Sequence, residues 1–267
     1  MDLVERARSG DANALEELIV SIQDKIYGLA IRMLWHPDDA RDATQEILIR
    51  IVTHLSAFRG DSAFSSWCYA VAANYLRTAS KSRMERENYT FTRFEEDLLD
   101  GAEEPSDDLR QRPDYLLLLE EIKIGCTLGM LLCLDRDHRL AYILGEILEV
   151  ESTEAAMIVN ISSDAFRKRL SRARRRIISF TSRLCGVVDP KNACHCRRRA
   201  TAALESGRVT ASQLLFPVAP DAFESAEREV QKLEKARRLA ALYRFHPHFR
   251  AGDELSDRLR LLVRGLA

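Results

Sequence analysis

The sequence predicts an all-α protein in which two small helical domains are joined by an acidic linker and followed by a helical C-terminal extension. Apolar residues recur at helical spacing along most of the chain. Only 11 Gly and 7 Pro occur in 267 residues, and aromatic residues make up 7%, which favours helices. Because domains usually hold about 100–150 residues, we expect domains at 1–93 and 115–182, a linker at 94–114 and an extension at 183–267.

The first domain is predicted to be a helical bundle. Leu18, Ile22 and Ile26 mark the buried side of its first helix, and His36-Pro37 breaks that helix. Apolar positions at the same spacing indicate two more helices. The three helices are expected at residues 12–34, 40–56 and 65–86.

The linker is predicted from its charge. Acidic residues crowd between Glu95 and Asp108, together with Gly101, Pro105 and few apolar residues. A segment of this composition buries too little apolar surface to fold by itself, so we expect a flexible acidic tether.

The second domain contains a predicted helix-turn-helix. A short helix at 152–159 is followed by a tight turn at 160–162 and a longer helix from Ser163. Asn160 tolerates the left-handed conformation that a tight turn needs. Ala155 and Ala156 are small enough for two helices to approach closely.

The longer helix carries many basic residues and only one acid, Asp164. A solvated helix normally mixes charges of both signs, whereas a helix of one sign repels itself unless a polyanion neutralises it. DNA phosphates supply that charge, and arginine also reads guanine edges. The basic residues are Arg167, Lys168, Arg169, Arg172, Arg174, Arg175 and Arg176.

The segment from Phe58 to Arg77 gathers side chains that suit an unstacked nucleobase. Aromatic rings stack on a base, an amide reads its edge and cations bind its phosphate. Its amino-acid sequence closely resembles the promoter-melting segment of bacterial sigma factors of the extracytoplasmic-function (ECF) group. The matching residues are Phe58-Arg59-Gly60-Asp61-Ser62-Ala63-Phe64, followed by Trp67, Tyr69 and Asn74.

The resemblance extends over residues 1–93 and 115–180. The run Asp39-Ala40-Arg41-Asp42-Ala43-Thr44-Gln45-Glu46, the loop and the turn motif occur in the family's order. It implies a promoter-recognition subunit of bacterial RNA polymerase rather than an enzyme, with 1–93 as region two and 115–182 as region four.

The family's functional residues match named positions here. Phe58 and Asn74 match the pocket for a flipped base of the −10 element, and Trp67 matches a supporting aromatic. The resemblance assigns −10 phosphate contacts to Arg77, Lys81 and Arg83, −35 reading to Arg167, Lys168, Ser171 and Arg172, and polymerase docking to Asp42, Gln45, Glu46 and Arg50.

The resemblance also implies partners. They are promoter DNA and core RNA polymerase, through the clamp of the largest subunit and the flap of the second. The acidic linker would follow the RNA-exit path. An anti-sigma protein is a further partner that the resemblance leaves open.

The extension contains a cluster of Cys185, Cys194, His195 and Cys196 around a turn. The function requires no cofactor, but these residue types suit zinc or another soft metal, as in ECF relatives with metal-sensing cysteine-rich extensions. A distant ligand is available in His246 or His248. Unligated thiols and a redox pair activated by nearby arginines are the alternatives.

Other residues of this part of the chain are expected to be structural. Cys126 and Cys133 lie on an apolar helix and are predicted to be core residues. Amphipathic spacing predicts helices at 222–244 and after Asp253.

Composition excludes several classes. The net charge is −1, so local segregation of charge rather than a global basic balance indicates DNA binding. No apolar run reaches the roughly 20 residues of a membrane span and the start lacks a signal-peptide pattern, so we expect a cytoplasmic protein. No enzyme motif is present. The alternatives are a stand-alone helix-turn-helix regulator and a metal- or redox-sensing DNA-binding protein.

Overall fold

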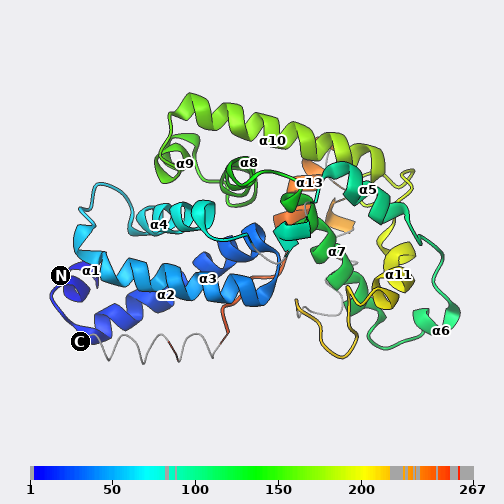
Figure 1. Cartoon of the computed structure of the whole chain (residues 1–267), viewed down its shortest axis with the longest axis horizontal. Helices are drawn as coiled ribbons and strands as arrows, with labels where there is room; N and C mark the ends of the chain where they lie inside the picture. Colours follow the sequence, from blue (N-terminus) through cyan, green and yellow to red (C-terminus); the bar gives the residue numbers. More distant parts are fainter. Residues whose placement is uncertain are drawn as a thin grey trace.

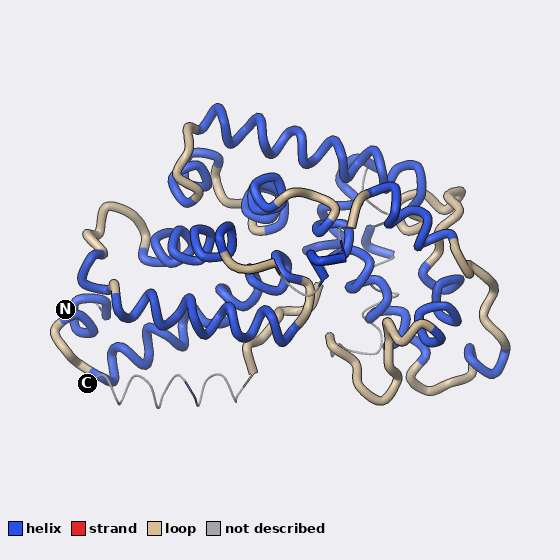
Figure 2. The backbone as a smooth tube through the Cα atoms, viewed as in Figure 1, coloured by secondary structure: helices blue, strands red, loops and turns tan. Residues whose placement is uncertain are grey.

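The structure, a computed structural model, describes residues 3–81, 84–87, 89–216, 225, 228–230, 232, 235–244, 246–252 and 258. Figure 2 shows that these residues form helices and loops without a named strand. The predicted all-α fold is confirmed. None of the helices within these ranges is long and apolar enough to cross a membrane.

The N-terminal part is a bundle of α1 (Leu3–Arg8), α2 (Ala12–Leu34), α3 (Pro37–Thr53), the turn η1 (Leu55–Ala57) and α4 (Phe64–Thr78). The Asp11 carboxylate caps α2 by accepting from the backbone N–H groups of Asn13 and Ala14. Pro37 occupies the start of α3, where its missing N–H is tolerated. The first two predicted helices therefore exist, with α3 displaced by about one turn toward the N-terminus.

The third helix ends earlier than the sequence predicts, at Thr78 instead of Arg86, and a short turn η2 (Met84–Glu87) follows the break. The guanidinium of Arg136 donates hydrogen bonds to the carbonyl oxygens of Arg77, Ala79 and Ser80. A side chain distant in sequence thus satisfies the carbonyl groups at the end of α4, and the chain turns away there.

The acidic linker is also more ordered than predicted. It contains α5 (Phe91–Leu99) and α6 (Asp107–Arg110). Phe94 and Leu98 are buried, and the Phe94 ring stacks on Phe180 with centroids 5.9 Å apart. The prediction of a flexible tether was wrong for α5. This short amphipathic helix packs its apolar side on Phe180 of α10, a contact that composition does not reveal.

The second part comprises α7 (Tyr115–Leu132), α8 (Arg136–Tyr142), the π-helical turn η3 (Ile143–Ile147), α9 (Ser152–Ile158) and α10 (Ser163–Leu184). Asn160 has φ 53° between α9 and α10, as the sequence predicts. Ala155 and Ala156 are buried at the close approach of these helices. The helix-turn-helix is therefore present.

The extension contains η4 (Cys196–Arg199), α11 (Ala200–Glu205) and α13 (Lys235–Arg244). The helices η4 and α11 pack on α7, and α13 packs on α10 and η3 (Figure 1). Of the helix predicted at 222–244, α13 covers 235–244, and residues 225 and 228–230 are also helical; the rest of 222–234, apart from 232, lies outside the described residues. The helix predicted after Asp253 lies outside them except for residue 258. One hydrophobic core runs through all these parts, and the predicted domain boundaries stay a prediction.

Candidate nucleic-acid interface

The outer face of α10 presents the side chains predicted to read DNA. Ser162 caps the helix by accepting from the N–H of Ala165, 3.2 Å away. Phe166, Leu170 and Ala173 turn inward and are buried. Their spacing leaves the opposite side of the helix exposed, and that side carries the predicted −35 residues Arg167, Lys168, Ser171 and Arg172.

The basic helix does have acidic partners, which sequence reasoning did not see. Arg167 pairs with Asp164 on its own helix. The inner arginines pair with other elements, Arg169 with Asp137 at 3.3 Å and Arg174 with Glu146. The helix itself carries a single acid, as expected, but α8 and η3 bring further carboxylates to its inner side. Charge therefore remains concentrated on the outer face.

The predicted −10 residues on α4 face the second part of the molecule. Asn74 and Arg77 line a cleft of about 450 Å³, whose opposite wall is formed by Asp135, Arg136 and Asp137 of the α8 end. The Arg77 Nε atom lies 2.9 Å from the Asp137 carboxylate. Lys81 is exposed, and Arg83 lies outside the described residues.

A second set of contacts joins both ends of α4 to α9 and its C-cap. The Ser66 hydroxyl donates to the Glu154 carboxylate on α9. The Arg77 Nη1 atom donates to the Val159 carbonyl oxygen at 3.4 Å. Figure 1 shows α8 and α9 lying between α4 and α10. The helix-turn-helix therefore rests on α4 in this structure.

Phe58 lies in the small core at the base of the loop. Its exposed fraction is 8%, and its ring is 5.4 Å from that of Phe64 and 5.6 Å from that of Trp67. Phe58 does not line the cleft that contains Asn74. The structure thus gives Phe58 and Trp67 the same packing role, and it does not bring Phe58 and Asn74 into one pocket.

The predicted docking residues lie on one side of α3. Asp42 and Arg50 are exposed, and Gln45 and Glu46 are half-buried between them. The Glu46 carboxylate accepts from Arg50 Nε at 3.0 Å, four residues apart. The four side chains recur at helical spacing and form one polar strip, as a docking face requires.

Comparison with known proteins identifies the family of this chain. The family description Sigma-70 region 2 matches residues 18–85, from α2 to η2. The RNA polymerase sigma-H factor of Pseudomonas aeruginosa is 30% identical over 177 residues, which cover 66% of this chain and 90% of the relative. The ECF RNA polymerase sigma-E factor of Escherichia coli K12 is 30% identical over 178 residues, with the same coverage. The chain belongs to the ECF sigma factors. The resemblance stated from the loop and docking motifs is confirmed.

This ECF sigma factor directs RNA polymerase to promoters in transcription initiation. DNA binding and interaction with core polymerase belong to that function. The individual contact residues stay predictions, and so does a regulatory role of the extension.

The cysteine cluster of the sigma factor lies in the described part of the chain, and its metal binding stays a prediction. Within those ranges, no three His, Cys, Asp or Glu side chains are placed to hold a metal ion, and all six cysteines are present as thiols. The Gly186 N–H donates to the Cys194 carbonyl oxygen at 2.7 Å, which joins the backbones of the turn. Burial raises the pKa of Cys194 to about 12, so its thiol is neutral.

Other predicted residues of the extension have structural neighbours. The His246 Nε2 atom lies 2.7 Å from the Thr127 hydroxyl, in the core, and His248 is exposed. Cys126 and Cys133 are partly buried against the core. Cys126 also lines a cavity.

Sequence reasoning missed three residues that hold the sigma factor's two parts together. Trp35 ends α2 with φ 71° and donates from Nε1 to the Gly125 carbonyl oxygen at 2.9 Å. Arg139 is buried and donates to the carbonyl oxygens of Met33 and Leu131. Arg136 binds the end of α4. A sequence signal existed for Arg139, a charged residue directly before the apolar run Leu140-Ala141-Tyr142, because such a residue is rarely buried without partners.

Proposed function

We propose that this sigma factor reads the −35 element with the outer face of α10. The observation that carries the proposal is the exposed row of Arg167, Lys168, Ser171 and Arg172 on the second helix of a helix-turn-helix. Such a helix fits the major groove, where arginine binds guanine and phosphate. The apolar inner stripe fixes which side faces outward.

The −10 element is assigned to the α4 region. Asn74 supplies an amide to read the edge of an extruded base, and Arg77 and Lys81 bind the backbone. Capture of the base offsets an unstacking free energy of about a few kcal/mol. Phe58 supports the loop, and its burial in this structure makes Asn74 the more direct test.

Binding at −10 requires α4 to separate from α8 and α9. The Arg77 guanidinium cannot bind phosphate while it pairs with Asp137. We therefore interpret the structure as a closed form, in equilibrium with an open form that binds promoter and polymerase. The surface pairs that close it are individually weak, but part of the shared hydrophobic core also lies between α4 and α9, so polymerase binding must offset the exposure of that core.

Core polymerase docking is assigned to the strip of α3, against the clamp of the largest subunit, with region four on the flap of the second subunit. The protein acts in the cytoplasm with polymerase. Catalysis belongs to polymerase, and the sigma factor contributes binding free energy alone.

In-vitro transcription with core polymerase tests the proposal. Asn74→Ala should lower open-complex formation at least about tenfold, because a buried base edge loses its hydrogen-bond partner, while polymerase binding stays unchanged. Asp42→Ala with Arg50→Ala should instead weaken polymerase binding.

Arg41→Ala on the same helix is the matched control for the docking variants, because it removes a half-buried residue whose pair with Asp38 lies within α3. Normal opening by Asn74→Ala would contradict the −10 assignment. If every variant still initiated normally at promoters, the whole proposal would be contradicted.

A further inference from the structure

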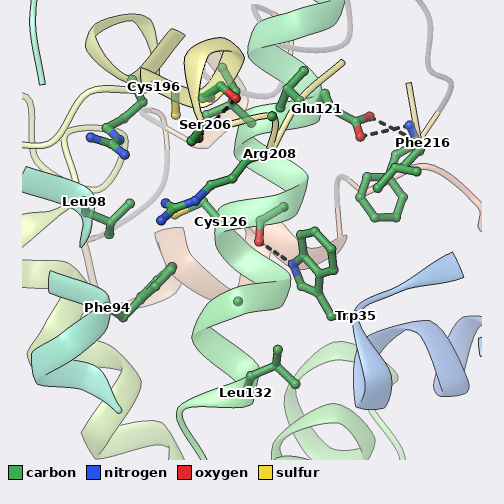
Figure 3. Close-up of a pocket in the computed structure, with 18 of the residues that line it drawn as sticks. Trp35, Phe94, Leu98, Glu121, Cys126, Leu132, Cys196, Ser206, Arg208 and Phe216 are labelled. Atoms are coloured by element: carbon green, nitrogen blue, oxygen red, sulfur yellow. Dashed lines mark hydrogen bonds between the residues drawn. The ribbon is translucent and has the colours of Figure 1, made fainter. Parts of the chain in front are cut away.

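A cavity of about 360 Å³ lies between α7, α5 and the extension (Figure 3). Its walls are mostly apolar and include the rings of Trp35, Phe94 and Phe216. Figure 3 shows Glu121 beside Phe216 at one end, whereas Cys196 and Arg208 lie at the other side of the space. Its volume falls within the range of about 300–1,000 Å³ typical of small-molecule sites.

The cavity contains a buried cation that has no carboxylate partner among the described residues. Arg199 belongs to η4, lines the cavity and is only 6% exposed. Its Nη1 atom donates to the Asp100 carbonyl oxygen. Among the residues that the structure describes, no carboxylate lies within ion-pair distance of it. A buried guanidinium stays protonated, and without a counter-charge it destabilises its site.

The other polar groups of the cavity do not supply that counter-charge. The Glu121 oxygens accept from the N–H groups of Leu215 and Phe216, each at 2.9 Å. Arg208 pairs with Asp97 at 2.8 Å near the rim. Burial raises the pKa values of Cys126 and Cys194, so these thiols are neutral and add apolar surface.

We propose that this cavity binds a small apolar carboxylate, with the acid group on Arg199 and the apolar body against the aromatic walls. A carboxylate matches the fork of an arginine and supplies the missing negative charge. A neutral apolar molecule would fill the same walls but leave Arg199 without a counter-ion.

The position of the cavity links its occupancy to the closed form. Trp35 comes from the N-terminal bundle, Phe94 from α5, Cys126 from α7 and Arg199 from the extension. A ligand that contacts all four parts binds the closed form more tightly than an open one, and it stabilises the closed form by mass action. Resting on the proposed function, this predicts that the ligand lowers initiation.

Calorimetry on the full chain with 1-naphthoate and its neutral counterpart 1-naphthalenemethanol tests the site. Naphthoate should bind at least about tenfold more tightly than the alcohol, as a hydrogen bond to a charged group predicts. Arg199→Met should remove this preference while it still binds the alcohol, which shows that the cavity is intact. Arg198→Met is the matched control, because Arg198 pairs with Glu104 at 3.2 Å and does not line the cavity.

Equal affinity for acid and alcohol, binding of neither, or full naphthoate preference in Arg199→Met would overturn the proposal. The wild-type comparison decides even if the variant folds poorly. In transcription assays, naphthoate should inhibit wild type and spare Arg199→Met. If naphthoate bound without inhibiting transcription, only the link to the closed form would be overturned. If the wild-type protein did not initiate transcription even without ligand, the proposed function would be contradicted instead.

Discussion

The two predicted DNA-contacting surfaces, the outer face of α10 and the face of α4 that carries Asn74 and Arg77, differ in what lies in front of them. On α10 the predicted residues are exposed. On α4, Arg77 is engaged by Asp137 and Val159, and Asn74 lines a cleft against the α8 end. Both surfaces are polar and carry arginine. The difference teaches that availability depends on neighbouring elements rather than on the helix itself.

The largest effect on how the second part covers α4 is expected from Arg139, whose side chain joins α8 to the end of α2. Arg139→Ala leaves the carbonyl oxygens of Met33, Leu131 and Leu134 short of a donor. The Glu85 carboxylate loses this partner but keeps its pair with Arg136. We expect a loss of about 3–5 kcal/mol in the free energy of unfolding, measured by urea denaturation.

Arg41→Ala serves as the control for Arg139→Ala. It removes an exposed pair with Asp38 and should change stability by less than about 0.5 kcal/mol. Similar losses in both variants would show that the two parts do not depend on Arg139.

The exposed face of α10 can be tested directly on DNA. Arg172→Ala should weaken binding of the −35 element by about 1–3 kcal/mol if it contacts a base, roughly 5- to 150-fold in affinity. Fluorescence anisotropy with holoenzyme measures this. Arg183→Ala, near the far end of α10 and paired with Glu95, should leave affinity unchanged, and an equal loss there would refute the assignment of this face.

A pH series tests how the extension supports α7, which packs on α2, α5 and α8. Burial lowers the pKa of His246 well below its usual 6.5. Below about pH 6.5 the unfolded chain therefore binds a proton that the folded chain does not. His246 should make stability fall as pH decreases, by up to about 1.4 kcal/mol per pH unit.

Urea denaturation between pH 7.5 and pH 5.5 measures that slope. His246→Gln should reduce it, whereas His248→Gln, at an exposed position, should keep it. An unchanged slope in His246→Gln would remove His246 as the source.

The smallest expected effect is on promoter opening, and it comes from the ion pair between Arg77 of α4 and Asp137. Asp137→Asn removes the carboxylate shared by Arg77 and Arg169. Half-exposed pairs contribute about 0.2–1 kcal/mol each, so promoter opening should accelerate by up to about fivefold. Rates of open-complex formation measure it. Asp38→Asn, whose partner Arg41 lies on its own helix, is the control, and slower opening by Asp137→Asn would argue against a closed form.

Local sequence was sufficient for most of the helices and for the turn. The helical spacing of Leu18, Ile22 and Ile26 placed α2, and Asn160 placed the left-handed turn residue. The end of α4 and the helix α5 could not be predicted. Arg136 and Phe180, which stabilise them, are more than 50 residues away in the chain.

By itself, the sequence determined the helical class, the helix-turn-helix and the family, because these follow from spacing and short motifs within single elements. Only the tertiary structure decided that Arg77 is paired and Arg172 exposed, that Phe58 is packed, and that Arg199 lies beside an apolar cavity. These properties depend on which distant side chains and surfaces meet, and burial and charge pairing are set by that meeting rather than by neighbours along the chain.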